Sequence, residues 1–327
     1  MKSPVVIGVL AGLAFGLLYF LPLPGFIAGL GWGPLAAAIA VAVAALLVTA
    51  TSGVTAGFTH VITFGIPVLI ICHIAFLNRW VPSPQGSEST QPNQDETGPD
   101  GAADKGGTRE WYPLGRIVAW TLLMSGVLAL IATLSLGSSF ERYQETVRAA
   151  LDVNLLKQLE RLTGQPLGAD DKAAMIAFMV QRLPGMLSMT WLLLTLPSLW
   201  LAGRITKASG LLARPWEPVP AMQYPGYLPL VFAATLVASQ VPGLFGVIAG
   251  GFASALMLGY FILGLAILHY VTRTNPMRAF ILAPAYAALP FFGQIGGILL
   301  AIVGVGEHMF HLRQRADAAR SGRPPTT

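Results

Sequence analysis

Long apolar runs without a single charged residue alternate with short polar stretches along this chain. Five intervals contain no Asp, Glu, Lys or Arg: Ser3–Asn78, Ile117–Phe140, Leu183–Gly203, Pro218–Thr272 and Ala279–Gly306. A helix rises about 1.5 Å per residue and the hydrocarbon core of a bilayer is about 30 Å thick, so one crossing takes about 20 residues. The pattern therefore predicts an all-α fold, a polytopic transmembrane helix bundle of about 8 to 10 membrane segments.

One or two of these segments are expected to be short or broken. The predicted helices are Val5–Phe20, Phe26–Trp32, Leu35–Thr49, Val54–Leu77, Ile117–Leu136, Met186–Ala202, Leu228–Val241, Phe245–Val271 and Ala279–Gly306. Proline removes a backbone donor and clashes with the preceding turn, so Leu21–Gly25 interrupts the first helix and Pro290 breaks the last one. A straight helix over Ala279–Gly306 would be about 42 Å long. We therefore expect that run to fold as a bent pair.

The polar stretches divide the chain into four regions. Residues 1–78 are expected to form N-terminal transmembrane helices, 79–113 a disordered polar loop, 114–312 a C-terminal transmembrane bundle and 313–327 a basic cytoplasmic tail. The loop is rich in Ser, Gln, Pro and Gly and lacks apolar periodicity. Within the bundle region, an extramembrane loop at 139–184 carries apolar residues at helical spacing. Two amphipathic helices are predicted there, lying on the membrane surface or capping the bundle.

Composition and charge support a membrane protein. The chain is 54% hydrophobic and 11% charged, against roughly 25% charged residues in a soluble domain. Its net charge of +5 reflects Lys and Arg at the ends of apolar runs, which the positive-inside rule explains without a nucleic-acid partner. We expect a multi-pass protein of the bacterial inner (cytoplasmic) membrane with both termini cytoplasmic. The lone cysteine, Cys72, excludes an intrachain disulfide.

Polar residues inside the apolar runs are the candidates for a solute cavity. Thr55, Thr59, His60 and Thr63 share one predicted helix, and Gln240 and Gln294 each lie near a helix break. They either line a cavity for a neutral solute or form hydrogen bonds between helices. No metal or cofactor is expected, because no carboxylate lies in any span, and Cys72 and His73 point about 100° apart on a helix.

A stripe of glycines on the first helix is a second candidate surface. Gly8, Gly12 and Gly16 recur at four-residue spacing, the small-xxx-small pattern that allows close approach of two helices. The stripe is expected to serve helix packing within the protein or contact with a partner subunit.

Enzymatic signatures are missing from the sequence. It has no phosphate-binding loop, no His-Glu-x-x-His and no Gly-x-Ser-x-Gly. Glu307, His308 and His311 form the one dense cluster of acid–base groups, where a helix end is expected to enter water. We therefore expect no enzyme, and no catalytic residue is assigned.

Several short motifs resemble a known family. They are Trp111-Tyr-Pro-Leu-Gly-Arg116, Arg214-Pro215, Gly264-Leu-Ala-Ile-Leu-His269 with Arg273, and Gly306-Glu307 with Phe310, Arg313 and Arg315. On these residues the chain resembles the YybS-like family of uncharacterised bacterial multi-pass membrane proteins. It departs from that family at Phe310, where a tryptophan is expected, and in the length of its polar loop.

The resemblance implies a topology similar to the substrate-binding S-components of energy-coupling-factor transporters. It therefore implies a solute-binding or transport subunit that needs partner subunits. The alternative is a non-catalytic membrane scaffold for envelope or growth functions, acting through protein partners, and an enzyme whose site escapes motif analysis is a third. The lipid bilayer is the expected environment in each case, and the sequence names neither a solute nor an oligomeric state.

Overall fold

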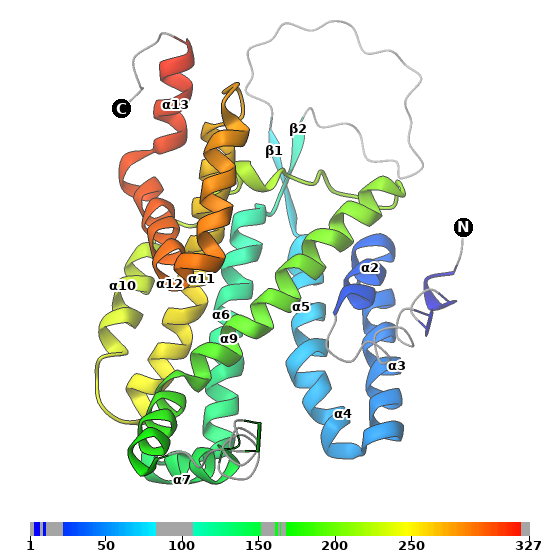
Figure 1. The fold of residues 1–327 in the computed structure, drawn as a ribbon. Coiled ribbons are helices and arrows are strands. Elements are labelled where there is room, and N and C mark those ends of the chain that lie inside the picture. The colour runs from blue at the N-terminus through cyan, green and yellow to red at the C-terminus, as the bar shows by residue number, and fades with distance from the viewer. Residues whose placement is uncertain are drawn as a thin grey trace, which may run out of the picture.

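The structure, a computed structural model, describes residues 3–6, 9–10, 22–82, 107–151, 161–162, 164 and 168–321, with the backbone alone at 107, 288–294 and 321. Within these residues the fold is all-α, as predicted, apart from one pair of short strands. Figure 1 shows the helices packed side by side as a bundle, with the strand pair at one end.

The first half of the chain forms an N-terminal group of helices followed by the strands. Its elements are α2 (Leu23–Trp32), α3 (Pro34–Ser52), α4 (Val54–His60), the π-helical turn η1 (Val61–Gly65), α5 (Ile66–Ala75), β1 (Asn78–Pro82) and β2 (Gly107–Trp111). Gly53 joins α3 to α4 with φ of 91°, a backbone conformation that glycine adopts without steric cost.

The remaining elements form the larger part of the bundle. They are α6 (Leu114–Leu136), α7 (Phe140–Leu151), α9 (Ala169–Ala208), the 3-10 turn η3 (Val219–Ala221), α10 (Leu228–Ala238), α11 (Leu244–Val271), α12 (Arg278–Phe310) and α13 (Leu312–Ser321). We call the stretch 209–227, between α9 and α10, the connector.

Five of the described helical segments are long and apolar enough to cross a membrane: α3, the continuous run α4–η1–α5, α6, α9 and α11. Ile295–Phe310 and Leu312–Arg320 together would be a sixth, bent by 72°, and α2 and α10 are shorter apolar helices. The short segment expected at Phe26–Trp32 is therefore confirmed as a helix. Most of the expected helix Val5–Phe20 lies outside the described residues.

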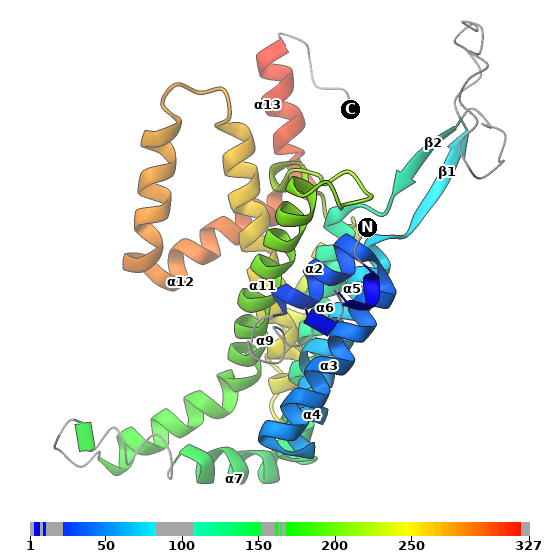
Figure 2. The same cartoon turned by 90° about the vertical axis from the view of Figure 1, so that its right-hand side faces the viewer.

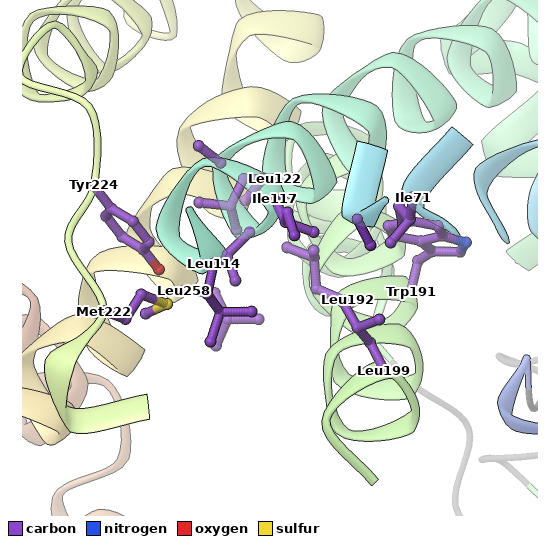
Figure 3. Close-up of a cluster of buried hydrophobic side chains, with 14 of the residues drawn as sticks. Ile71, Leu114, Ile117, Leu122, Trp191, Leu192, Leu199, Met222, Tyr224 and Leu258 are labelled. Carbon is purple, nitrogen blue, oxygen red and sulfur yellow. The ribbon is translucent and has the colours of Figure 1, made fainter. Parts of the chain in front are cut away.

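The core lies where α5, α6, α9, α11 and the connector meet. Figure 3 shows Leu114, Ile117 and Leu122 of α6 beside Leu192 and Leu199 of α9, with Met222 and Tyr224 entering from the connector. These side chains are buried and belong to one continuous apolar cluster. The connector contributes large side chains to this core, since Trp216, Met222 and Tyr224 need apolar neighbours.

Neighbouring side chains satisfy backbone groups that prolines leave open. Pro67, in α5, cannot donate to the carbonyl of Thr63 four residues earlier. The indole Nε1 of Trp191 on α9 donates to that carbonyl at 2.7 Å. In an apolar environment no water is present to donate to this carbonyl. The hydrogen bond therefore also joins the N-terminal helices to α9.

The extramembrane loop caps one end of the bundle, one of the two arrangements that the sequence allowed. Tyr143 and Val147 of α7 pack against Ile176 and Val180 of α9 and Val247 of α11. The second predicted amphipathic helix and the predicted span Met186–Ala202 are a single helix, α9, that contains Pro184 and Pro197. Figure 2 shows this long helix changing direction along its length.

The predicted disordered loop 79–113 needs a correction at both ends. Asn78–Pro82 and Gly107–Trp111 pair as antiparallel strands, because cross-strand partners there are complementary. Arg79 lies opposite Glu110, and the Nε–Oε2 distance is 2.7 Å. Residues 83–106 lie outside the described part of the chain. Figure 2 shows the strand pair extending away from the helices.

The C-terminal region differs from the simple tail expected at 313–327. Leu312–Ser321 forms the helix α13, which contacts α11. The expected bent pair is a single helix, α12, that bends in its middle (Figure 2). The sequence places Pro290 within it, and a bend is the usual result of a proline inside a helix.

Cationic residues gather at one end of the bundle. The strands, the connector, the α11–α12 turn and α13 all lie at the top of Figure 1, while the α3–α4 turn, α7 and the α10–α11 turn lie at the bottom. We call the first the cationic end and the second the α7 end. The described Arg and Lys residues of the cationic end are Arg79, Arg109, Arg116, Arg204, Lys207, Arg214, Arg273, Arg278, Arg313, Arg315 and Arg320.

Candidate solute-binding site

The polar residues that the sequence predicts for a cavity do not lie together, as far as the structure describes them. Thr55 and Thr59 are exposed on α4, whereas His60 is buried with its ring 5.8 Å from that of Phe64. Consecutive residues on a helix point about 100° apart, so His60 faces inward while the threonines face outward. Thr63 is half-buried.

The remaining predicted residues lie elsewhere. Gln240 is in the α10–α11 turn, and its Nε2 donates to the carbonyl of Leu236 at 3.3 Å. It also lines a cavity between α9, α10, α11 and α12, well away from His60 on α4. The side chain of Gln294 lies outside the described part of the structure, as do Gly8, Gly12 and Gly16.

A large apolar cavity lies under the connector, at the cationic end. We call it the connector cavity, and its volume is about 640 Å³, well within the 300–1,000 Å³ typical of ligand pockets. It is walled by α6, α9 and α11, roofed by the connector and bordered by α12, through Leu114, Val118, Leu192, Leu193, Leu196, Pro197, Leu199, Trp200, Trp216, Val219, Pro220, Met222, Leu258, Ile262, Leu265, Ala266, His269 and Tyr286.

The cavity opens sideways from the bundle. Leu193 and Trp200, which line it from α9, are 60% and 47% exposed. In a bilayer such side chains face acyl chains, so the opening faces the hydrocarbon region. An apolar molecule dissolved in the membrane has direct access to it.

Arg214 fixes the connector over the cavity. It is 3% exposed, and its Nη1 and Nη2 donate to the carbonyls of Ala75 and Tyr112 at 2.9 and 3.0 Å. Burial lowers the pKa of Arg214 from its ordinary value, and the nearby Glu217 carboxylate opposes that shift. The contacts join the connector to the end of α5 and the start of α6.

Arg313 fixes the other side of the connector. Its Nη1 donates to the carbonyls of Pro220 and Met222 at 3.0 and 2.8 Å, and its Nε donates to Glu307 Oε1 at 2.8 Å. Both side chains of the ion pair are nearly buried. Leaving a buried guanidinium without its partners costs several kcal/mol of stability. The connector is therefore held firmly over the cavity.

Polar groups border the connector cavity at the cationic end. Arg278 Nη2 lies 3.1 Å from His269 Nδ1, and His269 Nε2 lies 2.7 Å from the Tyr286 hydroxyl. Arginine has no acceptor, so Nδ1 accepts from Arg278, and the neutral ring carries its proton on Nε2 and donates to Tyr286. The cavity is thus apolar inside with a hydrogen-bonded rim.

A smaller and more polar cleft of about 470 Å³ lies between the connector, α11, the end of α12 and α13. Glu307, His308, His311, Arg313 and Asp317 contribute to its walls. Within the part of the chain that the structure describes, no group of three or more His, Cys, Asp or Glu side chains is placed to hold a metal ion.

Sequence reasoning missed the site because its polar anchors look like loop charges. Arg214 and Arg313 fit the positive-inside rule equally well whether exposed or buried. One signal was available: Trp216, Met222 and Tyr224 are large side chains in a stretch rich in proline. Large apolar residues in a connector indicate that it packs on something.

Fold and cavity together define an α-helical membrane protein with a cavity that opens toward lipid. A family model described as "Predicted membrane protein (DUF2232)" matches residues 110–306, more than half of the chain. The chain belongs to this family. No curated protein and no solved structure matches it.

Proposed function

We propose that this protein binds a largely apolar molecule, taken from the surrounding bilayer, in the connector cavity. The observation that carries the proposal is the cavity itself: about 640 Å³, lined by apolar and aromatic side chains and roofed by a connector that two buried arginines hold. Ligand pockets commonly combine such a lining with a few polar groups. The Arg278–His269–Tyr286 chain supplies these groups.

The role is binding, without catalysis. It agrees with a solute-binding or transport subunit of the S-component kind, to which the YybS-like resemblance points. The chain carries no phosphate-binding loop, so uphill transport would rely on partner subunits. The proposal includes no nucleic-acid partner, metal or cofactor.

The bound molecule can be tested with an uncharged long-chain alcohol that carries a nitroxide quencher at its chain end. In discs of phosphatidylcholine, we expect saturable quenching of Trp200 and Trp216, both of which line the cavity. Leu196→Phe places a ring into the cavity and should weaken that quenching several-fold. Leu194, equally half-buried on α9 but absent from the cavity wall, gives the matched control Leu194→Phe.

The Trp216→Phe variant assigns the quenched fluorescence to the cavity. If quenching grew in proportion to the alcohol in the bilayer without saturating, the alcohol would only partition into the lipid and would have no site on the protein. That result would refute the proposal. Equal quenching in Leu196→Phe and Leu194→Phe would also refute it.

We further propose that the protein lies in the bacterial inner membrane with its cationic end in the cytoplasm, and that both termini are cytoplasmic. Short loops rich in Lys and Arg are retained on that side. In a Cys72→Ala background, an impermeant thiol reagent applied from outside should label Ser139→Cys, at the α7 end, but not Ser209→Cys in the connector. Labelling of both from the same side would contradict the orientation.

A second candidate function, a membrane scaffold acting through protein partners, is favoured by the strand pair. Arg109 lies over the rings of Trp80 and Trp111, at 5.3 and 5.7 Å from their centroids, and Trp80 is 63% exposed. Tryptophan and arginine are enriched at interfaces. If the strands bind a partner subunit, Trp80→Ser should abolish copurification without lowering the melting temperature in detergent.

A further inference from the structure

A second cavity continues the connector cavity toward the α7 end of the bundle. It also measures about 640 Å³ and lies between α9, α10, α11 and α12. We call it the far cavity. Leu258 of α11 lines both cavities, and it is 7% exposed. Along α9 the far cavity includes Met189 and the connector cavity begins at Leu192, so the two lie end to end.

The far cavity is chemically divided along its length. Met189, Met257, Phe261 and Ile298 form its apolar part, next to the connector cavity. Gln181, Arg182, Ser239 and Gln240 also line it, and they lie on the α9 segment before Pro184 and in the α10–α11 turn, at the α7 end. The mouth is therefore polar and the interior apolar.

The charge at this mouth is unbalanced. Arg182 is exposed, and among the described residues that line the far cavity it is the one charged side chain, with no carboxylate beside it. Among the described residues no ion pair is formed with it. By contrast, Arg273 and Arg320 at the other end both pair with Asp317. A guanidinium free to form charge-assisted hydrogen bonds favours a carboxylate or phosphate group.

We propose that the two cavities together hold an amphiphile with a single long apolar chain and an anionic head group. Its head lies at Arg182 and its chain extends past Leu258 into the connector cavity. Arg182 and Trp200 are separated by about 27 Å along α9, comparable with the hydrocarbon thickness of about 30 Å. The chain of such a molecule therefore stays at membrane depth throughout.

This inference rests on the proposed binding function and adds the head group and the direction of the chain. Gln181 supplies a further amide donor beside the guanidinium, whereas the Nε2 of Gln240 already donates to the Leu236 carbonyl at 3.3 Å and to the Ser239 hydroxyl at 3.0 Å. The uncharged Ser239 hydroxyl donates to the Leu236 carbonyl at 2.7 Å and accepts from the Nε2 of Gln240 at 3.0 Å, so its one proton is not available to a head group. Arg182 is thus the group that distinguishes an anion from a neutral head.

The test compares hexadecyl phosphate, hexadecanoate, hexadecanol and hexadecyltrimethylammonium, each with a nitroxide at its chain end, in discs of phosphatidylcholine. We expect both anions to quench Trp200 and Trp216 saturably and more tightly than the alcohol, and the cation to bind most weakly. Arg182→Gln should weaken both anions by on the order of tenfold and leave the alcohol unchanged. Comparing the affinities of hexadecyl phosphate and hexadecanoate then shows whether an alkyl phosphate or a fatty acid fits the site better.

Two control variants make the result specific. Arg148→Gln removes an exposed arginine of α7 at the same end that does not line the cavity, and it should have no effect. Arg182→Lys keeps the charge and should retain most of the anion preference. Since Arg182 is exposed, none of these changes threatens folding.

Three results would overturn the inference while leaving the proposed function intact. One is anion affinity unchanged in Arg182→Gln. Another is equal affinity for alcohol and anions in the unsubstituted protein. The third is anion affinity that falls with Arg278→Gln instead, because the head would then lie at the cationic end. Loss of the proposed function would differ from all three, since the alcohol itself would then show no saturable quenching.

Discussion

The hydroxyl of Tyr143, on α7, donates to the carbonyl of Val180, on α9, at 2.9 Å. Pro184 lies four residues after Val180 and has no N–H to donate, so that carbonyl lacks the regular hydrogen bond of an α-helix. Tyr143 is fully buried, and burial raises its pKa to about 12. The amphipathic helix thus completes a hydrogen bond that a proline leaves open in its neighbour.

This relationship predicts a non-additive pair of substitutions. Tyr143→Phe removes the donor and leaves a buried carbonyl unsatisfied, which should cost about 1–3 kcal/mol. In a Pro184→Ala background the new N–H of residue 184 serves the same carbonyl, so Tyr143→Phe should cost markedly less. Melting temperatures of the four proteins in mild detergent give the coupling energy. Purely additive effects would show that the hydroxyl contributes nothing through Val180.

The crossing of α11 and α12 depends on two glycines that face each other. A Cβ on Gly264 would meet the carbonyl of Leu300, and a Cβ on Gly304 would meet the carbonyl of Tyr260 and lie 3.1 Å from the Gly264 nitrogen. Gly304→Ala should therefore separate the helices and destabilise the fold by about 1–3 kcal/mol. A Cβ on Gly297, in the same helix, would meet nothing within 4 Å, so Gly297→Ala is the matched control.

Of the two variants, Gly304→Ala should lower the detergent melting temperature and Gly297→Ala should not. Alanine favours a helix over glycine by roughly 1 kcal/mol, so Gly297→Ala should be neutral or stabilising. If Gly304→Ala behaved like Gly297→Ala, the crossing would not depend on close backbone approach.

Removing one partner of the buried ion pair Arg313–Glu307 should destabilise the fold by more than the pair itself contributes to stability, because the other partner is left buried and unpaired. Arg313→Met strands the Glu307 carboxylate and the carbonyls of Pro220 and Met222, which should cost about 3 kcal/mol or more. Adding Glu307→Gln removes the stranded charge and should restore part of that loss, though the two carbonyls stay without their donor. Thermal unfolding in detergent provides the measurement, and a double variant less stable than Arg313→Met would contradict this account.

The docking of α13 should depend on pH through Asp317. Its carboxylate accepts from the Tyr270 hydroxyl at 2.7 Å and pairs with Arg273 and Arg320. The Tyr270 hydrogen bond and these two guanidinium groups outweigh desolvation and hold the pKa of Asp317 below its usual range. Because the folded-state pKa is depressed, the contribution is complete above the ordinary pKa of an aspartate and is lost as the pH falls through the lowered value.

Trypsin provides a direct measurement of this docking at neutral pH, since α13 contains Arg315 and Arg320. Asp317→Asn imitates the protonated side chain and should raise cleavage within α13 by about two- to fivefold, the scale of an exposed ion pair. Asp170→Asn, at the other end of the bundle, should leave cleavage unchanged. Equal cleavage of the two variants would mean that Asp317 does not hold α13.

The sequence by itself determined the class and most helices of this protein. Charge-free runs such as Ile117–Phe140 are too apolar for a soluble fold, and lipid requires that their backbone be helical. Proline and glycine positions located the C-terminal end of the short segment expected at Phe26–Trp32 and anticipated a bend in α12, whereas the start of that segment was wrong, because α2 begins at Leu23 and includes Pro24 in its first turn. Periodicity likewise revealed α7, because a helix with one apolar stripe repeats every three to four residues.

Tertiary structure alone decided which residues meet. Hydropathy treats a lipid-facing side chain and a buried one alike, so the sequence grouped Thr59 with His60, whereas the helix turns one outward and the other inward. The arginines raised the same ambiguity, because a cation beside a membrane segment satisfies the positive-inside rule in either position. Only the packing of the connector over α6, α9 and α11 buries Arg214 and Arg313 and forms the cavity beneath them, since the carbonyls that bind these arginines come from residues distant in sequence.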